Sequence, residues 1–259
     1  METYQQTYTI LASDMDVTYH ITPNAIMLYF QDCFARFLSS KHLAAFDIIK
    51  ENLIWVISDF ELHFLKERPL WSSTIKVNIR FTEISTIRIY VDYWLTDEAD
   101  ETFVEGTSIW AILNNVTKRP FAAKEYLSQG GIVADGDVTT TRCTTDSSEK
   151  AFLKEVTHQV NVTDLDFNGH VCNRTYLSIA VSTFPLEFVK TYSPHYIHIK
   201  FTRESFINEK LTCRIFSSPH QQYWFDILNA QGKEVCAIYT EWDDSVEVLS
   251  KDVSEQINR

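Results

Sequence analysis

Glycine and proline are scarce in this chain of 259 residues, with six of each. Both residue types concentrate in turns and loops, so we expect few long irregular stretches. The five cysteines are widely spaced and include no C-x-x-C pair, which fits reduced thiols in a cytoplasm better than a disulfide framework. No segment approaches the roughly 18 uninterrupted apolar residues of a membrane helix. The N-terminal METYQQTYTI has no basic region followed by an apolar run, so we predict a cytoplasmic protein without signal peptide or membrane contact.

Basic residues are outnumbered, because 23 Lys and Arg stand against 35 Asp and Glu and give a formal net charge of −12. This balance argues against nucleic acid and acidic membrane surfaces as main partners. No cofactor and no metal ion are expected. Apolar residues are abundant, at 45% hydrophobic and 14% aromatic, as in an ordered globular protein. Either a monomer or a homodimer is compatible with this composition.

An internal repeat organises the chain. The segment ASDMDVTYHI at 12–21 and the segment VTDLDFNGHV at 162–171 align at a constant offset of 150 positions. The aligned pairs are Asp14 with Asp164, Met15 with Leu165, Asp16 with Asp166, His20 with His170, and Ile21 with Val171. Each segment is followed by apolar residues at helical spacing, over 23–43 in the first case and over 173–184 in the second. Pro185 is expected to end or kink the second helix.

Stretches rich in β-branched and aromatic residues follow each predicted helix. They cover 55–65, 74–82, 86–96 and 104–113 in the first half, and 195–203, 210–217, 222–229 and 234–242 in the second. Each half therefore reads as one strand, one central helix and about four antiparallel strands, an α+β arrangement. We expect the two sheets to pair edge to edge. The predicted domains are 1–127 and 150–259, joined by a linker at 128–149 that is rich in Gly, Ser, Thr and Asp.

The second repeat segment carries an acid, an amide and an imidazole at Asp166, Asn168 and His170. In an extended stretch, side chains at i, i+2 and i+4 share one face, so these groups are expected to lie together. Gly169 lets backbone or ligand approach closely. The first amides of the helix starting at Asn173 lack intrahelical partners and could hold a developing negative oxygen. Together these groups are adequate for acyl transfer to water.

The alternative interpretation is structural, because Asp, Asn and Gly are common in caps and turns. The first copy keeps the Asp and the His but has Thr18 and Tyr19 where the second has Asn168 and Gly169. The shared residues can thus be partly structural, while Asn168 and Gly169 mark the second copy as different.

The stretch DLDFNGHVCNRTYL resembles the D-x-N-x-H-V-x-N stretch of the acyl-ACP thioesterases, the plant plastid enzymes and their bacterial relatives. The resemblance covers nearly the whole chain, including WVISDFELHFLKERPLWSSTIKV, SIWAILNNVTKRP and YIHIKFTRESF. It implies a double hot-dog fold, in which each repeat packs a central helix on a curved antiparallel sheet. The lack of a segment like the plant transit peptide favours a bacterial relative.

The resemblance also implies roles for Asp166, Asn168, His170 and Glu204, and it aligns the family's cysteine with Ser205. An unactivated serine hydroxyl is a far weaker nucleophile than a thiolate, so we predict direct hydrolysis by water. In this hypothesis Glu204 and Asp166 position and deprotonate water, Asn168 and the helix amides stabilise the oxyanion, and His170 orients the thioester or protonates the thiolate. Alternatively, Glu204 forms a salt bridge with Arg203 or Lys200. Cys172 is interpreted as a buried residue at the helix start.

The family places the acyl chain in the first half, which implies substrate-binding side chains on the first helix and its facing strands: Ile26, Phe30, Phe34, Trp55 and Trp110. Any of these could equally be plain core. The implied partner, acyl carrier protein (ACP), is acidic and would need a local basic patch, with candidates Lys66, Arg68, Lys118, Arg119, Lys200 and Arg203. The open alternatives are an acyl-CoA thioesterase, a double hot-dog hydratase or dehydratase, and a carrier-binding protein without catalysis.

Overall fold

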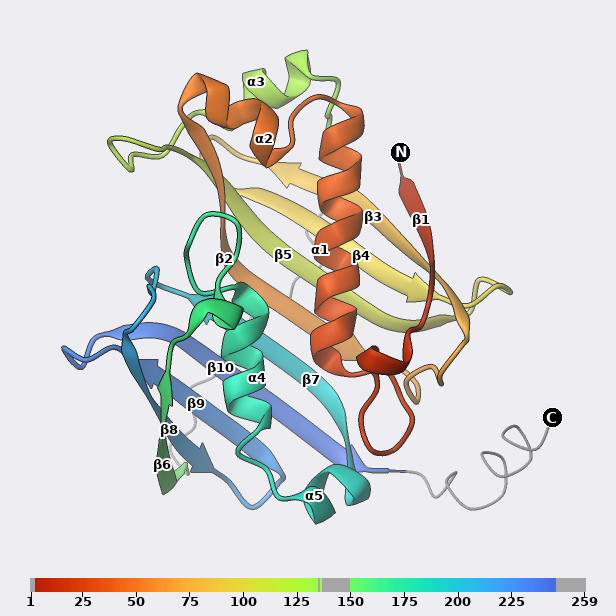
Figure 1. The fold of residues 1–259 in the computed structure, drawn as a ribbon. Helices are drawn as coiled ribbons and strands as arrows, with labels where there is room; N and C mark the ends of the chain where they lie inside the picture. The colour runs from red at the N-terminus through yellow and green to blue at the C-terminus, as the bar shows by residue number, and fades with distance from the viewer. Residues whose placement is uncertain (1–2, 135, 137–149, 246–259) are drawn as a thin grey trace.

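The computed structural model describes residues 3–134, 136 and 150–245. Its strands form one ten-stranded antiparallel sheet in the order β1-β3-β4-β5-β2-β7-β10-β9-β8-β6 (Figure 1). The strands of the first half are β1 (Tyr4–Thr9), β2 (Leu53–Phe64), β3 (Thr74–Ile84), β4 (Ile89–Thr96) and β5 (Thr102–Asn114). Those of the second half are β6 (Ala151–Gln159), β7 (Tyr192–Phe201), β8 (Lys210–Ser217), β9 (Gln222–Leu228) and β10 (Glu234–Asp244).

The two halves repeat one topology. Reading inward from each outer edge, the first half runs β1-β3-β4-β5-β2 and the second runs β6-β8-β9-β10-β7. The halves meet where β2 pairs with β7 in antiparallel register, from Asp59 opposite Lys200 to His63 opposite Tyr196. The predicted edge-to-edge pairing of the two sheets is therefore present, and it removes one exposed edge from each half.

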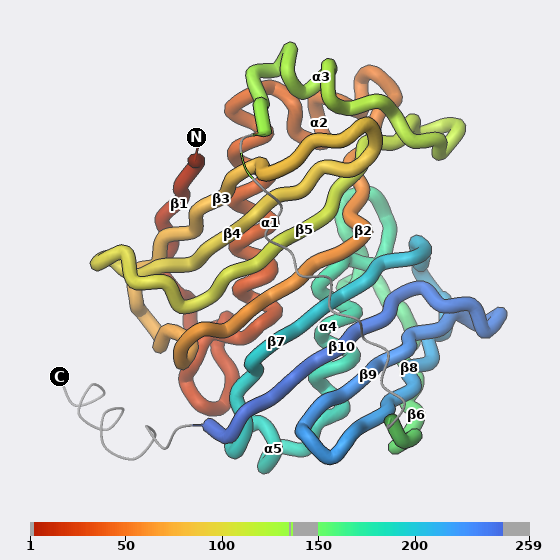
Figure 2. Tube along the Cα trace, turned by 180° about the vertical axis from the view of Figure 1, so that it is seen from behind, coloured from red at the N-terminus to blue at the C-terminus, as the bar shows by residue number. Residues whose placement is uncertain are grey.

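The long helix of each half lies on the same face of the sheet, with α1 (Pro23–Ser40) over the first half and α4 (Asn173–Val181) over the second (Figure 1). Figure 2 shows the strands of both halves from behind, with these helices on the far side. The helix α1 begins where Thr22 accepts a hydrogen bond from the Ala25 amide and Pro23 occupies the first turn. The two helices contact each other through Asn24, whose amide donates to the Ser178 hydroxyl at 2.5 Å.

The predicted helices are confirmed with shorter ends, since α1 stops at Ser40 and α4 at Val181. Pro185 follows α4 as predicted and precedes a further short helix, α5 (Leu186–Thr191). The short helices α2 (Ala45–Ile48), α3 (Ala123–Gln129) and α5 were not predicted.

The predicted linker begins inside α3, and residues 137–149 of it lie outside the described residues, as do 246–259 of the polar tail. The α+β arrangement is confirmed. Within the described residues, no helix combines the length and apolar character needed to cross a membrane.

Candidate active site

The loop between β6 and α4 holds Asp166, Asn168 and His170 in a tight turn. Asp166 N–H donates to the His170 carbonyl at 2.8 Å, and Gly169 N–H donates to the Asp166 carbonyl at 3.0 Å. The prediction of an extended stretch with alternating faces is therefore wrong for these residues. The loop closes on itself, and closure rather than strand alternation brings Asp166 and His170 together.

The Asp166 carboxylate organises this loop. Its Oδ1 accepts the backbone N–H of Asn168 at 2.8 Å and that of His170 at 3.1 Å. Gly169 sits in the left-handed region with φ +78°, where a side chain is disfavoured. Apart from the neighbouring residues in the chain, no described atom would lie within 4 Å of a Cβ at Gly169, so the glycine serves the backbone angle rather than the close approach of another backbone segment. The Asn168 side chain is exposed.

Glu204 approaches this loop from the segment after β7. Its Oε1 lies 3.7 Å from His170 Nδ1, with 40% of the Glu204 side chain and 26% of the His170 side chain exposed. The predicted alternative partner Arg203 instead donates from Nη1 to the carbonyl of Glu234 at 2.7 Å. The ring of Phe206 packs edge-on against the His170 imidazole at 5.2 Å between centroids. The structure thus brings a carboxylate and an imidazole together at a half-exposed position.

Ser205 differs from its neighbour Glu204, because it is fully buried. Its carbonyl accepts the Val171 N–H at 2.9 Å, and its hydroxyl has no hydrogen-bond partner of standard geometry among the described residues. A buried hydroxyl without a base has no activating group. Cys172 is the N-cap residue of α4 and is partly exposed rather than buried. The start of α4 therefore directly follows the loop, as predicted.

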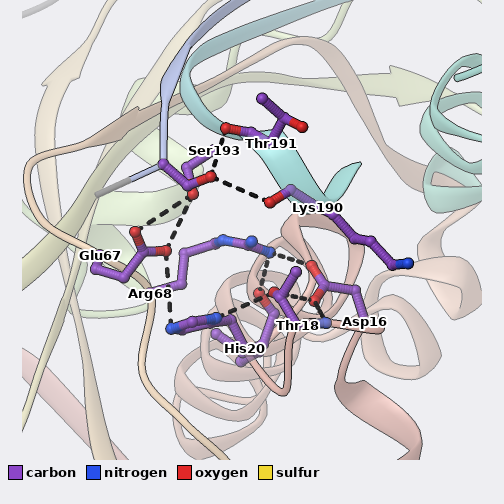
Figure 3. A network of polar contacts seen from close by, with 10 residues as sticks. Asp16, Thr18, His20, Glu67, Arg68, Lys190, Thr191 and Ser193 are labelled. Carbon is purple, nitrogen blue, oxygen red and sulfur yellow. Dashed lines mark hydrogen bonds and ion pairs between the residues drawn. The ribbon is translucent and has the colours of Figure 1, made fainter. Parts of the chain in front are cut away.

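The first copy builds the same loop into a buried polar network (Figure 3). Arg68 Nη1 donates to Asp16 Oδ2 at 2.7 Å and to the Ile21 carbonyl at 2.8 Å. Asp16 Oδ1 accepts both the amide and the hydroxyl of Thr18, and that hydroxyl lies 3.0 Å from His20 Nδ1. The exposed fractions of the Arg68 and Asp16 side chains are only 3% and 15%.

This network also reaches the second half of the chain. His20 Nε2 lies 3.8 Å from Glu67 Oε1, which accepts the Ser193 hydroxyl at 3.1 Å (Figure 3). Burial lowers the pKa of His20, against the opposing effect of Glu67. Tyr19 occupies the left-handed region with φ 63°, as Gly169 does in the second copy. The first loop thus keeps the backbone shape but encloses its charges.

The two copies differ at one ladder position that sequence alignment at offset 150 does not reveal. Ile21 N–H donates to the Pro69 carbonyl, and Val171 N–H donates to the Ser205 carbonyl. Arg68 in the first copy is therefore the counterpart of Glu204 in the second. A cation at this position pairs with Asp16 in the first copy, whereas in the second copy a carboxylate at the same position approaches His170. The sequence did not reveal this correspondence, because the segments RPLW at 68–71 and ESFI at 204–207 share no residue.

This pairing corrects the expected basic patch. Arg68 is 4% exposed and is held by Asp16, so it is not part of a surface that could meet an acidic carrier. Lys66 forms an ion pair with Glu101. The other candidates, Lys118, Arg119, Lys200 and Arg203, are exposed.

The expected acyl-binding side chains gather between α1 and the sheet of the first half. Phe34 stacks on Trp110 at 4.5 Å between centroids and meets Trp55 edge-on at 5.4 Å. Phe30 stacks on the fully buried Tyr93 at 5.0 Å, and Ile26 is also fully buried. Trp55 alone among the five is partly exposed, and its Nε1 donates to the Leu43 carbonyl at 2.9 Å. The five side chains thus pack as core residues.

The second-copy loop touches the first half near this aromatic cluster. The exposed ring of Phe167 lies 5.3 Å from that of Phe46, which belongs to α2. Figure 1 shows the loop before α4 reaching toward α2 and the beginning of β2, where Trp55 lies. The loop that carries the candidate site therefore contacts the first half of the chain through α2.

Two family models match consecutive parts of the chain. Residues 1–129 match the family model of the acyl-ACP thioesterase N-terminal domain, and residues 147–244 match that of the C-terminal domain. A chloroplastic acyl-[acyl-carrier-protein] hydrolase of Cuphea viscosissima is 23% identical over 208 residues, covering 74% of this chain and 49% of the relative. A chloroplastic palmitoyl-acyl carrier protein thioesterase of Gossypium hirsutum is 21% identical over 168 residues, covering 61% of this chain and 40% of the relative. The chain thus spans about half the length of these curated relatives or less.

Two solved structures share the fold. An acyl-ACP thioesterase from Bacteroides thetaiotaomicron superposes with a TM-score of 0.80 at 15% identity, covering 93% of this chain and 98% of the other. The 12:0-ACP thioesterase from Umbellularia californica superposes with a TM-score of 0.77 at 16% identity, covering 94% of this chain and 98% of the other. The predicted double hot-dog fold is confirmed. With both domain models matched in order along most of its length, the chain belongs to the acyl-ACP thioesterase family.

Proposed function

We propose that this protein hydrolyses fatty acyl-ACP thioesters to free fatty acid and ACP. The observation that carries the proposal is the pairing of Glu204 with His170, 3.7 Å apart and half exposed, beside a loop whose first-half counterpart is closed by a buried arginine. Membership of the acyl-ACP thioesterase family supports the choice of reaction.

In the proposed mechanism, Glu204 accepts a proton from a water molecule as the water oxygen attacks the thioester carbonyl carbon. The carbonyl π electrons move to the oxygen and form an oxyanion. When the oxyanion collapses, the C–S bond breaks, and the thiolate takes up a proton delivered from Glu204 through His170. General acid–base catalysis of this kind contributes roughly 10²–10⁴ in rate.

Asp166 and Asn168 have different proposed roles. Asp166 Oδ1 is occupied by two backbone N–H groups, so Asp166 acts by holding the loop, and its other oxygen is left to orient water. The exposed Asn168 amide and the first amides of α4 stabilise the oxyanion, and each well-placed donor contributes about 10²–10³ in kcat. Ser205 takes no covalent part, because its hydroxyl is buried and lacks a base.

We assign acyl-chain binding to residues 1–127 and the chemistry to residues 150–259, with 128–149 as the connection. The space between α1 and the sheet is filled by Ile26, Phe30, Phe34, Trp55 and Trp110. These side chains would border the far end of a bound acyl chain. Each methylene of the acyl chain that is buried contributes about 0.8 kcal/mol to binding. The bulk of these five side chains limits how many methylenes can be buried, and so limits the acyl-chain length. Trp110→Ala is expected to shift the preferred acyl-ACP toward longer chains in a competition assay, and an unchanged profile would refute this assignment.

ACP is the proposed partner and the cytoplasm the proposed location. Cys33, Cys172, Cys213 and Cys236 are free thiols, which fits a reducing compartment. Acyl-CoA is the alternative carrier, and a hydratase or dehydratase acting on enoyl or hydroxyacyl thioesters is the alternative reaction.

The test is a thiol-release assay on acyl-ACP, with parallel incubations on acyl-CoA and on an enoyl thioester followed by double-bond absorbance. Glu204→Gln is expected to lower kcat by roughly 10²–10⁴ with little change in KM. Arg203→Gln is the matched control, because Arg203 is the exposed neighbour whose side chain bonds a carbonyl instead. Full hydrolysis by Glu204→Gln would remove this glutamate from the mechanism, and a double-bond change without thiol release would replace the reaction.

A further inference from the structure

A polar pocket lies beside α4, and neither Glu204 nor His170 is among the residues that line it. It has a volume of about 340 Å³ and is lined by His158, Asp164, Arg174, Ser178, Ile179 and Ser182, among others. His158 Nε2 lies 2.9 Å from Asp164 Oδ2, which also accepts the Asn161 N–H at 2.9 Å. These residues take no part in the mechanism proposed above.

The first copy of the repeat has its corresponding space filled by two tyrosines. Tyr8 and Tyr29 pack with ring centroids 4.6 Å apart. The Tyr8 hydroxyl donates to Asp32 at 2.7 Å, and the Tyr29 hydroxyl donates to Asp14. At the offset of 150, these tyrosines correspond to His158 and Ile179, and Asp32 corresponds to Ser182. Smaller side chains in the second copy therefore open a pocket where the first copy is filled.

The same replacements change the charge of the pocket. Asp32 of the first copy becomes the neutral Ser182, and Asn24 becomes Arg174. Arg174 is exposed, and its guanidinium group forms no hydrogen bond or ion pair within residues 3–134, 136 and 150–245. The carboxylate of Asp164 is already occupied by His158 and a backbone amide. An uncommitted guanidinium beside hydroxyl groups is suited to a phosphoryl group.

The pocket belongs to the loop that carries the candidate active site. The Asp164 carbonyl accepts the Cys172 N–H at 2.8 Å, so Asp164 stands at the base of the loop while Asp166 and His170 stand two residues further out. A phosphoryl group held in this pocket would therefore be bound by residues that flank the loop with the candidate active site.

We propose that this pocket binds the phosphoryl group of a phosphopantetheine thioester, with Arg174 as the main donor. The inference rests on the proposed thioester hydrolysis and adds to it a binding contact outside the reacting groups. Phosphopantetheine carries such a phosphate whether it is attached to ACP or forms part of CoA. The pocket would therefore contribute to KM and leave kcat nearly unchanged.

The experiment compares Arg174→Gln and Ile179→Tyr with the parent protein on three thioesters of one acyl chain. The substrates are acyl-ACP, acyl-CoA and the acyl thioester of N-acetylcysteamine, which carries no phosphate. Ile179→Tyr reproduces the side chain that fills the first copy, and circular dichroism checks that it folds. Arg36→Gln is the matched control, because it removes the same charge from the exposed Arg36 of the first copy.

For Arg174→Gln we expect KM to rise about tenfold with acyl-ACP and with acyl-CoA, the effect of one charge-assisted hydrogen bond. KM for the N-acetylcysteamine thioester and kcat for all three substrates should stay within about twofold, and Ile179→Tyr should follow the same pattern. A rise with acyl-ACP alone would overturn the phosphoryl assignment in favour of contact with the carrier protein. Equal rises in KM for Arg174→Gln and Arg36→Gln would overturn the assignment of phosphoryl binding to this pocket. If the parent hydrolyses none of the three thioesters, the proposed function fails instead.

Discussion

The substitution Asp16→Asn tests whether the two copies of the loop have separated into a structural and a reactive form. It leaves the Arg68 guanidinium, whose side chain is 3% exposed, without its carboxylate partner at 2.7 Å. Removing one member of a buried ion pair destabilises a protein by about 3–5 kcal/mol, because an uncompensated charge remains buried. We expect a loss of this size in the free energy of unfolding.

The same substitution in the second copy, Asp166→Asn, is the matched comparison. Asp166 has no buried cation beside it among the described residues, and it accepts two backbone N–H groups. An asparagine oxygen can still accept these bonds, but as neutral ones, which are weaker by about 1 kcal/mol each. We therefore expect Asp166→Asn to cost only about 1–2 kcal/mol in stability while strongly reducing thioester hydrolysis.

Urea unfolding followed by tryptophan fluorescence measures both variants, and the thiol-release assay measures their activity below the unfolding transition. The double variant Asp16→Asn with Arg68→Met should lose less stability than the sum of the single losses, because both buried charges are gone. Equal stability losses for Asp16→Asn and Asp166→Asn would refute the division between the copies. So would a loss below 1 kcal/mol for Asp16→Asn.

Three further predictions concern single residues around the loops. Ser205→Ala should keep hydrolysis within about threefold and change the unfolding free energy by about 1 kcal/mol or less, because no base activates its buried hydroxyl, which interacts with the Tyr176 side chain; a hundredfold loss of kcat would favour a covalent route. Gly169→Ala should cost about 1–2 kcal/mol, since its φ of +78° is unfavourable for any side chain while no neighbour blocks the new methyl group; an unchanged unfolding midpoint would contradict this. Burial lowers the pKa of His20 in the folded protein, so neutral His20 contributes to the free energy of unfolding. This contribution is complete above about pH 6.5 and is lost as the pH falls from there toward the folded-state pKa. His20→Gln should flatten the fall of stability in that window, and an unaltered slope in pH-dependent unfolding would disprove the assignment.

The sequence predicted the repeat, the two long helices and the α+β arrangement because those features depend on local patterns. The alignment of 12–21 with 162–171 carries over to the backbone, where both loops close through an aspartate amide and a histidine carbonyl. Thr22 and Pro23 mark the start of α1 as capping rules predict. The short helices α2, α3 and α5 span only four to seven residues, too few for a periodic pattern to distinguish them from loops.

The candidate site was predicted less completely, because its decisive contact joins segments far apart in the chain. The grouping of Asp166 with His170 followed from spacing, although the turn that produces it did not. The role of Arg68 was predicted wrongly as a surface charge, since burial opposite Asp16 depends on how Pro69 pairs with Ile21 across the fold. Periodicity could likewise not tell whether Phe34 and Trp110 line a tunnel or pack against each other, because both uses require the same apolar face.

One position, Arg68 in the first copy and Glu204 in the second, sets the charge that faces each loop. With arginine at that position, the neighbouring aspartate is neutralised and the loop closes over its charges, as around Asp16. With glutamate there, no buried cation cancels the loop aspartate, and a second carboxylate stands 3.7 Å from the imidazole of His170. Burying a carboxylate and an imidazole is costly unless both are fully hydrogen-bonded, so a pair 3.7 Å apart is tolerated best where solvent reaches it. The partial exposure of Glu204 and His170 therefore agrees with the role proposed for them, whereas the burial of Arg68 and His20 suits a loop that only holds the fold together.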